Sequence, residues 1–298
     1  MRVAICGSSG LIGTALRNSL TADGHDVLRL VRRPAAGADE LQWDPAVGDI
    51  DPGPLEGLDA VVNLSGAGVG DRRWTKRYKQ ELYTSRIRPT AILAKAIVGL
   101  DRPPRVFVSP TGISVYGVDR GAEVVDEDSS SGTDFLAELC LAWQAAAEPA
   151  KDAGVAVCHP RFGLVMDRSG GAFKQMLPMF RFAVGGSLAG GRQYWSHVSL
   201  PDTVRALRFL IEQPGCVGAY NITAPEPATN AEFTRVLAHM LHRPAVLPVP
   251  RFALRLVLGE FTDYIAGSLR VVPHRLTEAG FVFQHRTTRE VVAAALHQ

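Results

Sequence analysis

Three glycines near the start of the chain stand where a phosphate group could be bound. Gly7, Gly10 and Gly13 follow a short apolar run at residues 3–6 and lead into a sequence with helical periodicity at residues 11–21. Glycine permits a tight turn and a close approach of the backbone to a pyrophosphate, and the following helix offers N–H groups and a positive dipole end. A plain tight turn is the alternative, but the position between a strand and a helix favours a dinucleotide site. The predicted contacts are Gly7, Ser9, Gly10, Leu11, Ile12 and Gly13.

Two arginines at the end of the next predicted strand, residues 26–32, indicate which dinucleotide is bound. A carboxylate at this place would bind the ribose 2′-hydroxyl of NAD, but the sequence here is Val31, Arg32 and Arg33. Guanidinium groups can hold a 2′-phosphate through paired hydrogen bonds, so we predict NADP(H) as the cofactor, bound by these three residues. The alternative is that two exposed arginines flank a turn.

The composition is that of a globular protein without a strong overall charge. The chain has 298 residues, 46% of them hydrophobic, and its 32 basic and 30 acidic residues give a net charge of +2. This length allows one large domain or two small ones, with a large buried core. The balanced charge favours neither nucleic acid nor an anionic membrane as a partner.

The four cysteines are Cys6, Cys140, Cys158 and Cys216, and they form no CxxC pair. This spacing argues against a disulfide scaffold or a zinc site, so we predict no metal, and it fits a reducing compartment. The sequence shows no signal-peptide pattern and no apolar run near the roughly 18 residues that span a bilayer. We therefore expect a cytoplasmic protein.

Short apolar strands alternate with amphipathic helices through the first half of the chain. Such βαβ units predict an α/β fold, namely a Rossmann doubly wound parallel sheet with helices on both faces. Proline at position 89 is expected to interrupt or kink one helix. The expected strands are residues 3–6, 26–32, 41–43, 60–64, 105–109 and 155–162, and the expected helices are residues 11–21, 75–99 and 134–150.

Glycine and proline become frequent after residue 162, and strand signals become sparse apart from residues 219–222. Helices are expected near the end, at residues 252–258 and 289–296. We expect a dinucleotide-binding Rossmann domain at residues 1–162, a smaller mixed substrate-side lobe at 163–247 that is partly interleaved with the sheet, and a helical C-terminal domain at 248–298. The last piece is too short to hold its own core, so we expect it to dock on the lobe or between subunits.

Further motifs are spread along the chain at residues 63–66, 73–75, 80–81, 85–86, 135–138, 190–193, 220–227, 229–233, 247–254 and 278–281. Together with the GxxGxxG spacing of residues 7–13, they make the chain similar to the extended short-chain dehydrogenase/reductase superfamily. Within it, the chain resembles the NAD-dependent epimerase/dehydratase family, in an epimerase-like subgroup with a C-terminal domain of unknown function. The resemblance implies a Rossmann sheet and a smaller substrate-side lobe.

The resemblance also implies further contacts to the cofactor. Residues 64–66 follow a buried strand, and ligands of open α/β sheets bind at the carboxyl ends of the strands. From the next helix, Arg86 can neutralise a phosphate, and Glu81 can hydrogen-bond a ribose hydroxyl or hold Arg86; the alternative is a solvated pair on the helix surface. Residues 162–164 stand where the family lays the nicotinamide half. The predicted contacts are Leu64, Ser65, Gly66, Glu81, Arg86, Phe162 and Leu164.

The catalytic motif of the superfamily is degenerate in this chain. The superfamily uses a Ser or Thr, a Tyr as general acid/base, and a Lys that lowers the Tyr pKa and binds the nicotinamide ribose. The corresponding helix carries Phe135 and Leu139 in one register and Leu136 and Cys140 in the next. Neither register restores a proton-transfer group, which puts the usual chemistry in doubt.

Three residues are candidate substitutes for this motif. Thr111 is the best match for the Ser/Thr position, with Ser114 second. Tyr116 can act as a substitute acid, or it can pack against the sheet edge. His197 has a suitable ordinary pKa for an acid, although a single histidine is more often structural. The predicted catalytic residues are therefore Thr111, Tyr116 and His197.

The segment around His197 also offers a candidate substrate pocket, walled by Arg192, Gln193 and Trp195. Asp202 can cap a helix at residues 203–212. The acidic residues 126–128 are expected to form a solvated loop rather than a paired acid/base site.

Two functions of different classes follow. The first is an NADP(H)-dependent oxidoreductase or epimerase-like enzyme with a small carbonyl or sugar-like substrate. The second is a non-catalytic NADP(H)-binding sensor or scaffold. The pattern indicates no particular oligomeric state.

Overall fold

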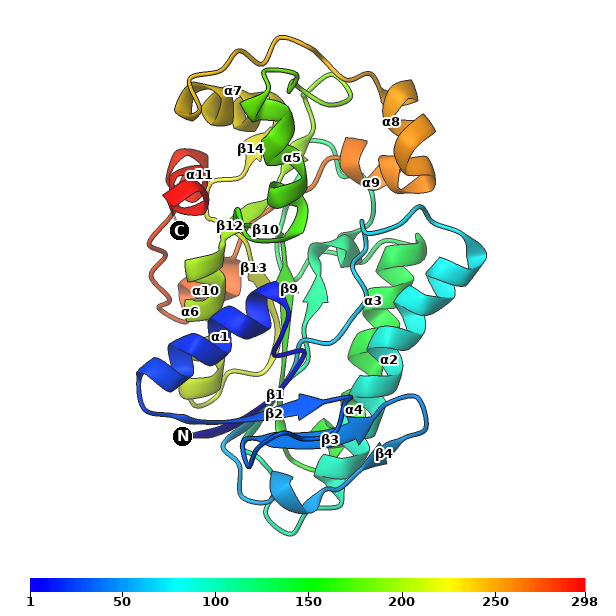
Figure 1. The fold of residues 1–298 in the computed structure, drawn as a ribbon, viewed down its shortest axis with the longest axis vertical. Coiled ribbons are helices and arrows are strands. Elements are labelled where there is room, and N and C mark those ends of the chain that lie inside the picture. Colours follow the sequence, from blue (N-terminus) through cyan, green and yellow to red (C-terminus); the bar gives the residue numbers. More distant parts are fainter. Residues whose placement is uncertain (298) are drawn as a thin grey trace.

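A mostly parallel sheet forms the centre of the molecule. The computed structural model describes residues 1–297 and shows an α/β body below a smaller lobe (Figure 1). Neighbouring strands run parallel except β3 and β4, and β7 (Thr111–Gly112) adds to β9. This confirms the predicted Rossmann-like α/β fold. The strand order is β13 (Gly218–Ile222), β9 (Ala156–Phe162), β6 (Val106–Val108), β5 (Ala60–Asn63), β1 (Arg2–Cys6), β2 (Asp26–Val31), β3 (Glu40–Asp44) and β4 (Asp49–Ile50).

Helices cover both faces of this sheet, which explains why β5 and β6 are fully buried apolar runs. One face packs against α1 (Leu11–Ala22) and α6 (Leu200–Glu212), and the other against α2 (Lys76–Val98), α3 (Phe135–Ala145) and α4 (Glu148–Asp152). The helix expected at residues 134–150 is two helices, because Pro149 starts a new one at α4. Pro89 lies inside α2, which the structure assigns as one helix.

The lobe above the body has its own core around Phe173, Trp195 and Phe233. Two short strand pairs brace it: β10 (Leu164–Met166) with β12 (His197–Ser199), and β11 (Tyr194–Trp195) with β14 (Ala228–Thr229). Its helices are α5 (Gly171–Arg181), α7 (Asn230–Met240) and α11 (Thr288–His297). The chain returns from the lobe to the main sheet at β13, which pairs with β9. The domain boundary at residue 162 remains a prediction.

The C-terminal segment runs across both parts. It contains α8 (Arg251–Leu258), η3 (Gly259–Phe261), α9 (Thr262–Ala266), β15 (Arg270–Val271) and α10 (His274–Glu278) before α11. Strand β15 pairs with β8 (Val124–Val125) of the body, and α11 packs against α7 of the lobe. Two short 3-10 turns complete the body, η1 (Gly53–Leu55) and η2 (Ile113–Tyr116). Within residues 1–297, every helix is too short or too polar to span a lipid bilayer.

Candidate functional site

The turn between β1 and α1 can be built only with glycine at two positions. Gly7 has a φ of +76°, and a Cβ on it would lie 2.5 Å from the carbonyl oxygen of Leu64 on the neighbouring strand end. A Cβ on Gly13 would lie 2.2 Å from the carbonyl oxygen of Gly7, because the first turn of the helix packs directly on the strand end. These two glycines therefore close the turn against the sheet.

Gly10 has a different role. A Cβ there would meet nothing closer than 3.4 Å, so the packing of the chain itself does not demand glycine. Gly10 is the N-cap of α1, yet it provides no side-chain cap, and the first turn contains no acidic residue. The N–H groups of Leu11, Ile12 and Gly13 consequently have neither a capping side chain nor a nearby carboxylate, which suits an anion. Ser9 is exposed beside them. The cradle fits a pyrophosphate.

Of the two arginines after β2, Arg33 is held by a carboxylate and Arg32, among residues 1–297, is not. The Nη1 and Nη2 atoms of Arg33 donate to the two carboxylate oxygens of Glu40 at 2.7 and 2.5 Å, and Arg29 adds an ion pair at 2.8 Å. The hydrogen bond from Arg33 is the main reason why the pKa of Glu40 falls to about 2. Arg32 is exposed and forms no ion pair with any carboxylate in the described part of the chain. Arg32 is thus the guanidinium free for a 2′-phosphate, while Arg33 fixes the loop.

The end of β5 is held in place by a buried amide. The Oδ1 atom of Asn63 accepts hydrogen bonds from the backbone N–H and the hydroxyl of Ser65, and its Nδ2 atom donates to Thr90 Oγ1 on α2 at 2.8 Å. The N–H of Leu64 donates to the carbonyl of Cys6 at the end of β1. Residues 64–66 therefore lie next to the β1–α1 turn, as the sheet topology predicts for cofactor contacts.

Arg86 is a buried cation beside these residues. It is 9% exposed, its Nη2 atom donates to the carbonyl of Ala67 at 2.8 Å, and its guanidinium lies 5.3 Å from the ring of Trp143. Burial lowers its pKa, and among residues 1–297 no carboxylate forms an ion pair with it. Such a group favours an anionic ligand nearby.

Glu81 does not hold Arg86. It lies on the exposed face of α2, with its carboxylate 3.7 Å from Arg72. The pairing of Glu81 with Arg86 that the sequence left open is therefore wrong, since five helical residues put the two side chains on different faces. A contact of Glu81 with a ribose stays a prediction.

Apolar side chains occupy the place of the missing Tyr-Lys pair. Leu136, Leu139 and Cys140 on α3 are all buried, and the Cys140 thiol lies 3.7 Å from the carbonyl oxygen of Gly112. Burial raises the pKa of Cys140 to about 11, so the thiol is no proton-transfer group near neutral pH.

Two of the three predicted catalytic residues have a buried polar atom without a hydrogen-bond partner among the described residues: Thr111 at Oγ1 and His197 at Nε2. Thr111 is 3% exposed in β7, opposite Arg161 of β9. A buried orphan hydroxyl at the carboxyl end of the sheet is suited to bind a ligand oxygen. Ser114, the second choice, is half-buried in η2.

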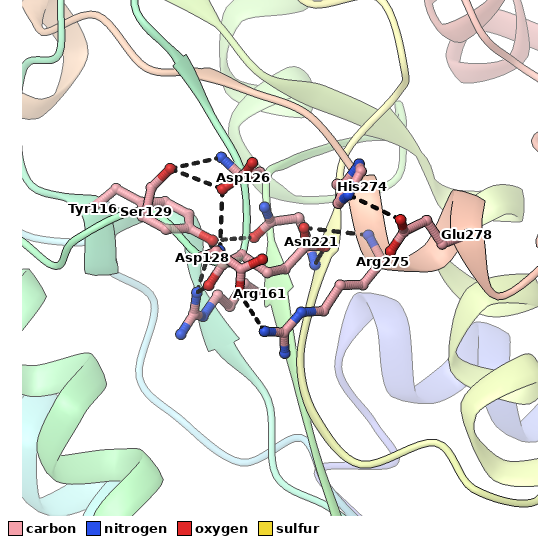
Figure 2. A network of polar contacts seen from close by, with 10 residues as sticks. Tyr116, Asp126, Asp128, Ser129, Arg161, Asn221, His274, Arg275 and Glu278 are labelled. Atoms are coloured by element: carbon pink, nitrogen blue, oxygen red, sulfur yellow. Dashed lines mark hydrogen bonds and ion pairs between the residues drawn. The ribbon is translucent and has the colours of Figure 1, made fainter.

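Tyr116 is part of a closed network (Figure 2). Its side chain is 1% exposed, its phenol donates to Asn221 Oδ1 at 2.7 Å, and it accepts a hydrogen bond from Arg161 Nη1 at 2.7 Å. Burial raises the phenol pKa. The hydrogen-bonding capacity of the phenol is used within the fold, so the structure favours packing at the sheet edge over a role as a substitute acid.

The acidic residues 126–128 are not a solvated loop throughout. Glu127 is 6% exposed, and its carboxylate accepts the backbone N–H groups of Asn221 at 2.8 Å and Arg275 at 3.3 Å. The Asp128 carboxylate forms an ion pair with the guanidinium of Arg275 at 2.5 Å (Figure 2). The cluster therefore ties α10 to the body and is not a paired acid/base site.

His197 is inaccessible. It is 1% exposed, its Nδ1 atom lies 2.9 Å from the carbonyl oxygen of Trp195, and its ring packs on Phe233 at 5.7 Å. Burial lowers its pKa to about 4. Its Nε2 atom has no hydrogen-bond partner among the described residues, but the ring is enclosed by the core of the lobe, so the structure favours the structural alternative.

The other candidate pocket residues are also used by the fold. Gln193 and Trp195 are buried and donate to the carbonyl oxygens of Leu188 and Ile265, while Arg192 is exposed. These side chains do not converge on a polar pocket. Phe162 and Leu164 are half-buried at the end of β9 and the start of β10.

Asp202 is not the cap of α6, because Ser199 holds that position. The buried Asp202 carboxylate instead accepts the backbone N–H groups of Gln284 at 3.0 Å and His285 at 2.8 Å. It thus fastens residues 284 and 285, which lead to α11, to the start of α6.

One set of contacts was missed by sequence reasoning. The Tyr264 phenol of α9 donates to Asp134, the N-cap of α3, and accepts the N–H of Leu136. Lys79 lies 4.9 Å from the ring of Phe135 and 2.6 Å from Glu260. The C-terminal segment therefore covers the start of the helix that carries the degenerate motif, and only the helix-capping aspartate gave a signal in the sequence.

Comparisons with known proteins place this geometry in a family. The family model described as NAD dependent epimerase/dehydratase family matches residues 3–223. The chain belongs to this family. A second model, a domain of unknown function (DUF1731), matches residues 249–295. Both findings confirm the resemblance predicted from the motifs.

Relatives of this family cover almost the whole chain. The Epimerase family protein Mb2239 of Mycobacterium bovis is 44% identical over 295 residues, which are 98% of this chain and 97% of that protein. A crystal structure of human epimerase family protein SDR39U1 (isoform 2) with NADPH has a TM-score of 0.91 and 32% identity, and all of each chain is covered. The nucleoside-diphosphate sugar epimerase from Corynebacterium glutamicum has a TM-score of 0.83 and 29% identity, covering 99% of this chain and 58% of that one.

Proposed function

We propose that this epimerase-family protein binds NADP(H) at the β1–α1 turn and acts on a small carbonyl or sugar-like substrate. The observation that carries the proposal is the uncapped start of α1, closed against the sheet by Gly7 and Gly13 and left open at Gly10. Arg32 adds a free cation for the 2′-phosphate. A similar human protein was crystallised with NADPH, which supports this choice of cofactor.

The chain's own residues would act mainly by binding and positioning. The N–H groups of the first turn of α1 hold the pyrophosphate, and the buried cation of Arg86 adds positive charge from α2. A dinucleotide held by these residues would supply or accept a hydride. The free Oγ1 atom of Thr111 would hold the substrate oxygen. Water would give or take the proton that accompanies the hydride, because the Tyr116 phenol is hydrogen-bonded within the fold and the His197 ring packs on Phe233 in the lobe.

Binding and turnover can be tested separately. Calorimetric titration with NADPH and NADH tests the cofactor, and tighter binding of NADH would overturn the assignment. Turnover is followed with NADPH and a panel of small carbonyls at the absorbance band of the reduced nicotinamide. Loss of turnover in Thr111→Ala, with Ser114→Ala as the matched control, would support the enzyme.

A second candidate function rests on one observation. The residues at the place of the Tyr-Lys pair are apolar or a buried thiol, and all three predicted catalytic residues are buried in the fold. This favours a non-catalytic NADP(H)-binding sensor or scaffold. Tight NADPH binding together with no turnover across the carbonyl panel would support this second function.

A further inference from the structure

A second concave site lies in the lobe, on a different part of the molecule from the β1–α1 turn. Helices α7 and α11 pack against each other in the lobe, with α7 at its far end from the central sheet and α11 between α7 and the body (Figure 1). A surface cavity of about 250 Å³ lies at this contact, and it is lined by Arg235, Val236, His239, Met240 and Arg289.

Two arginines place positive charge at the cavity, and within the described residues neither is in salt-bridge contact with a carboxylate, although Glu232 acts on Arg235 from a longer distance. Arg235 and Arg289 are exposed, and across residues 1–297 neither forms an ion pair with a carboxylate. His239 adds a third side chain that can donate a hydrogen bond. Two guanidinium groups on adjacent helices repel each other, and an anion between them would remove that repulsion.

The carboxylates close to these arginines in sequence are Glu232 and Glu290, and both accept hydrogen bonds from backbone N–H groups. Glu232 accepts hydrogen bonds from the backbone N–H and hydroxyl of Thr229, at 2.8 and 2.9 Å, and so caps α7. Glu290 accepts the backbone N–H groups of Arg286 and Thr287, at 2.8 and 2.9 Å, at the start of α11. Each helix thus uses its acidic residue at its own N-terminus and leaves the arginine for the cavity.

The floor of the cavity is apolar. Val236 and Met240 lie one helical turn apart on α7 and are half-buried. An inorganic ion would leave this floor in contact with water, whereas a short apolar group would cover it. The volume is slightly below the roughly 300–1,000 Å³ of pockets for drug-sized ligands, so a small ligand fits.

We propose that this cavity binds a small amphipathic anion, with a carboxylate or phosphate held by Arg235 and Arg289 and a short apolar body on Val236 and Met240. The site is separate from the proposed cofactor site. It does not depend on which dinucleotide the chain binds.

Titration calorimetry on the full chain tests the proposal with four probes: hexanoate, hexyl phosphate, inorganic phosphate and hexanol. We expect hexanoate, hexyl phosphate or both to bind with a Kd below about 1 mM. Comparing these two probes distinguishes a carboxylate ligand from a phosphate ligand. Inorganic phosphate should bind at least about tenfold more weakly, because it has no apolar chain to cover Val236 and Met240. Hexanol should not bind, because it has no anionic group for the two arginines.

Arg235→Gln and Arg289→Gln should each weaken binding of the amphipathic probe by about tenfold or more, since a charge-assisted hydrogen bond is lost. Arg88→Gln, an exposed arginine on α2, is the matched control and should leave binding unchanged. All three variants should keep the melting temperature and the NADPH affinity of the parent. The proposal is overturned if neither amphipathic probe binds, if inorganic phosphate binds equally well, or if Arg88→Gln weakens binding as much as the cavity variants.

Discussion

The guanidinium of Arg33, just after β2, and the carboxylate of Glu40, the first residue of β3, form a two-point pair with N···O distances of 2.7 and 2.5 Å. This pair engages Arg33 within the protein. Its neighbour Arg32 remains without a carboxylate partner among the described residues. Because Arg33 is held in an ion pair and Arg32, in the described part of the chain, is not, we predict that Arg32 determines the preference for NADPH over NADH.

Arg32→Ala is expected to weaken NADPH binding by about ten- to a hundredfold, because a guanidinium–phosphate contact is worth roughly 1.5–3 kcal/mol. NADH binding should change little, since NADH has no 2′-phosphate. Calorimetric titration of both dinucleotides measures the two effects.

Arg33→Ala serves as the comparison for Arg32→Ala. It removes one of the two cationic partners of Glu40, leaving Arg29, and should lower the melting temperature and weaken binding of NADPH and NADH to a similar degree. If Arg33→Ala alone removed the preference for NADPH, the assignment to Arg32 would be wrong.

Gly13→Ala should mainly lower the stability of the fold, whereas Gly10→Ala should mainly lower the affinity for NADPH. A Cβ on Gly13 would lie 2.2 Å from the Gly7 carbonyl oxygen, so backbone must shift, and we expect a loss of stability of about 1–3 kcal/mol. Gly10→Ala meets only a 3.4 Å contact and should cost no more than about 1 kcal/mol.

The cofactor measurement separates these two glycines. Gly10→Ala should weaken NADPH binding, because the methyl group would stand where the pyrophosphate approaches the backbone. Thermal denaturation with and without NADPH measures both quantities. Unchanged NADPH affinity in Gly10→Ala would contradict the proposal that the pyrophosphate binds beside Gly10 at the start of α1.

Local patterns predicted the sheet and the glycine turn, because strand, turn and helix are contiguous in sequence. The partners of buried polar groups were not predictable in this way. Glu127 binds Asn221 and Arg275, which lie 94 and 148 residues away. Its carboxylate therefore resembled a solvated loop in the sequence, although it is buried. The same limit applies to Tyr116, whose partner Asn221 lies 105 residues away.

Tyr116→Phe is expected to lower the free energy of unfolding without changing NADPH affinity or turnover. The variant leaves Asn221 Oδ1 without its donor and takes away an acceptor of Arg161, in a region that is closed to water, at a cost of about 1–3 kcal/mol. NADPH affinity and any turnover should stay within about twofold of the parent.

Chemical denaturation and steady-state assays distinguish the two roles of Tyr116. The matched control is Tyr83→Phe, at a tyrosine that is 39% exposed, and it should change neither quantity. A turnover that collapses in Tyr116→Phe at unchanged stability would restore this phenol as the acid.

The C-terminal segment is expected to contribute to the stability of the whole chain. Deleting residues 249–298 removes the contacts of Tyr264 with α3 and the strand pairing of β15 with β8. We expect a melting temperature lower by more than about 10 °C. An unchanged melting temperature would contradict docking of this segment.

Asp202→Asn is a milder test of the same docking. It keeps the shape of the side chain but removes the charge that holds two backbone N–H groups and Arg205, at a cost of about 1–3 kcal/mol. Asp51→Asn, on the exposed surface, is the control and should leave the melting temperature unchanged.

His197 makes the stability of the fold depend on pH. Burial lowers its pKa from 6.5 to about 4 in the folded chain, so between these values the unfolded chain binds the extra proton. The stability that His197 contributes is therefore present above the unfolded pKa and is lost as pH falls toward 4, which amounts to about 2 kcal/mol between pH 7 and pH 5.

His197→Gln tests this pH dependence. The variant should lower the melting temperature at pH 7, because Gln fills the space less well, but the fall in melting temperature between pH 7 and pH 5 should be smaller than in the parent. The control is His274→Gln, at a side chain that is 50% exposed, which should keep the parent's pH dependence. If His197→Gln kept the full fall in melting temperature, the imidazole would be accessible to protons in the folded state, and its exclusion from the proposed reaction would no longer hold.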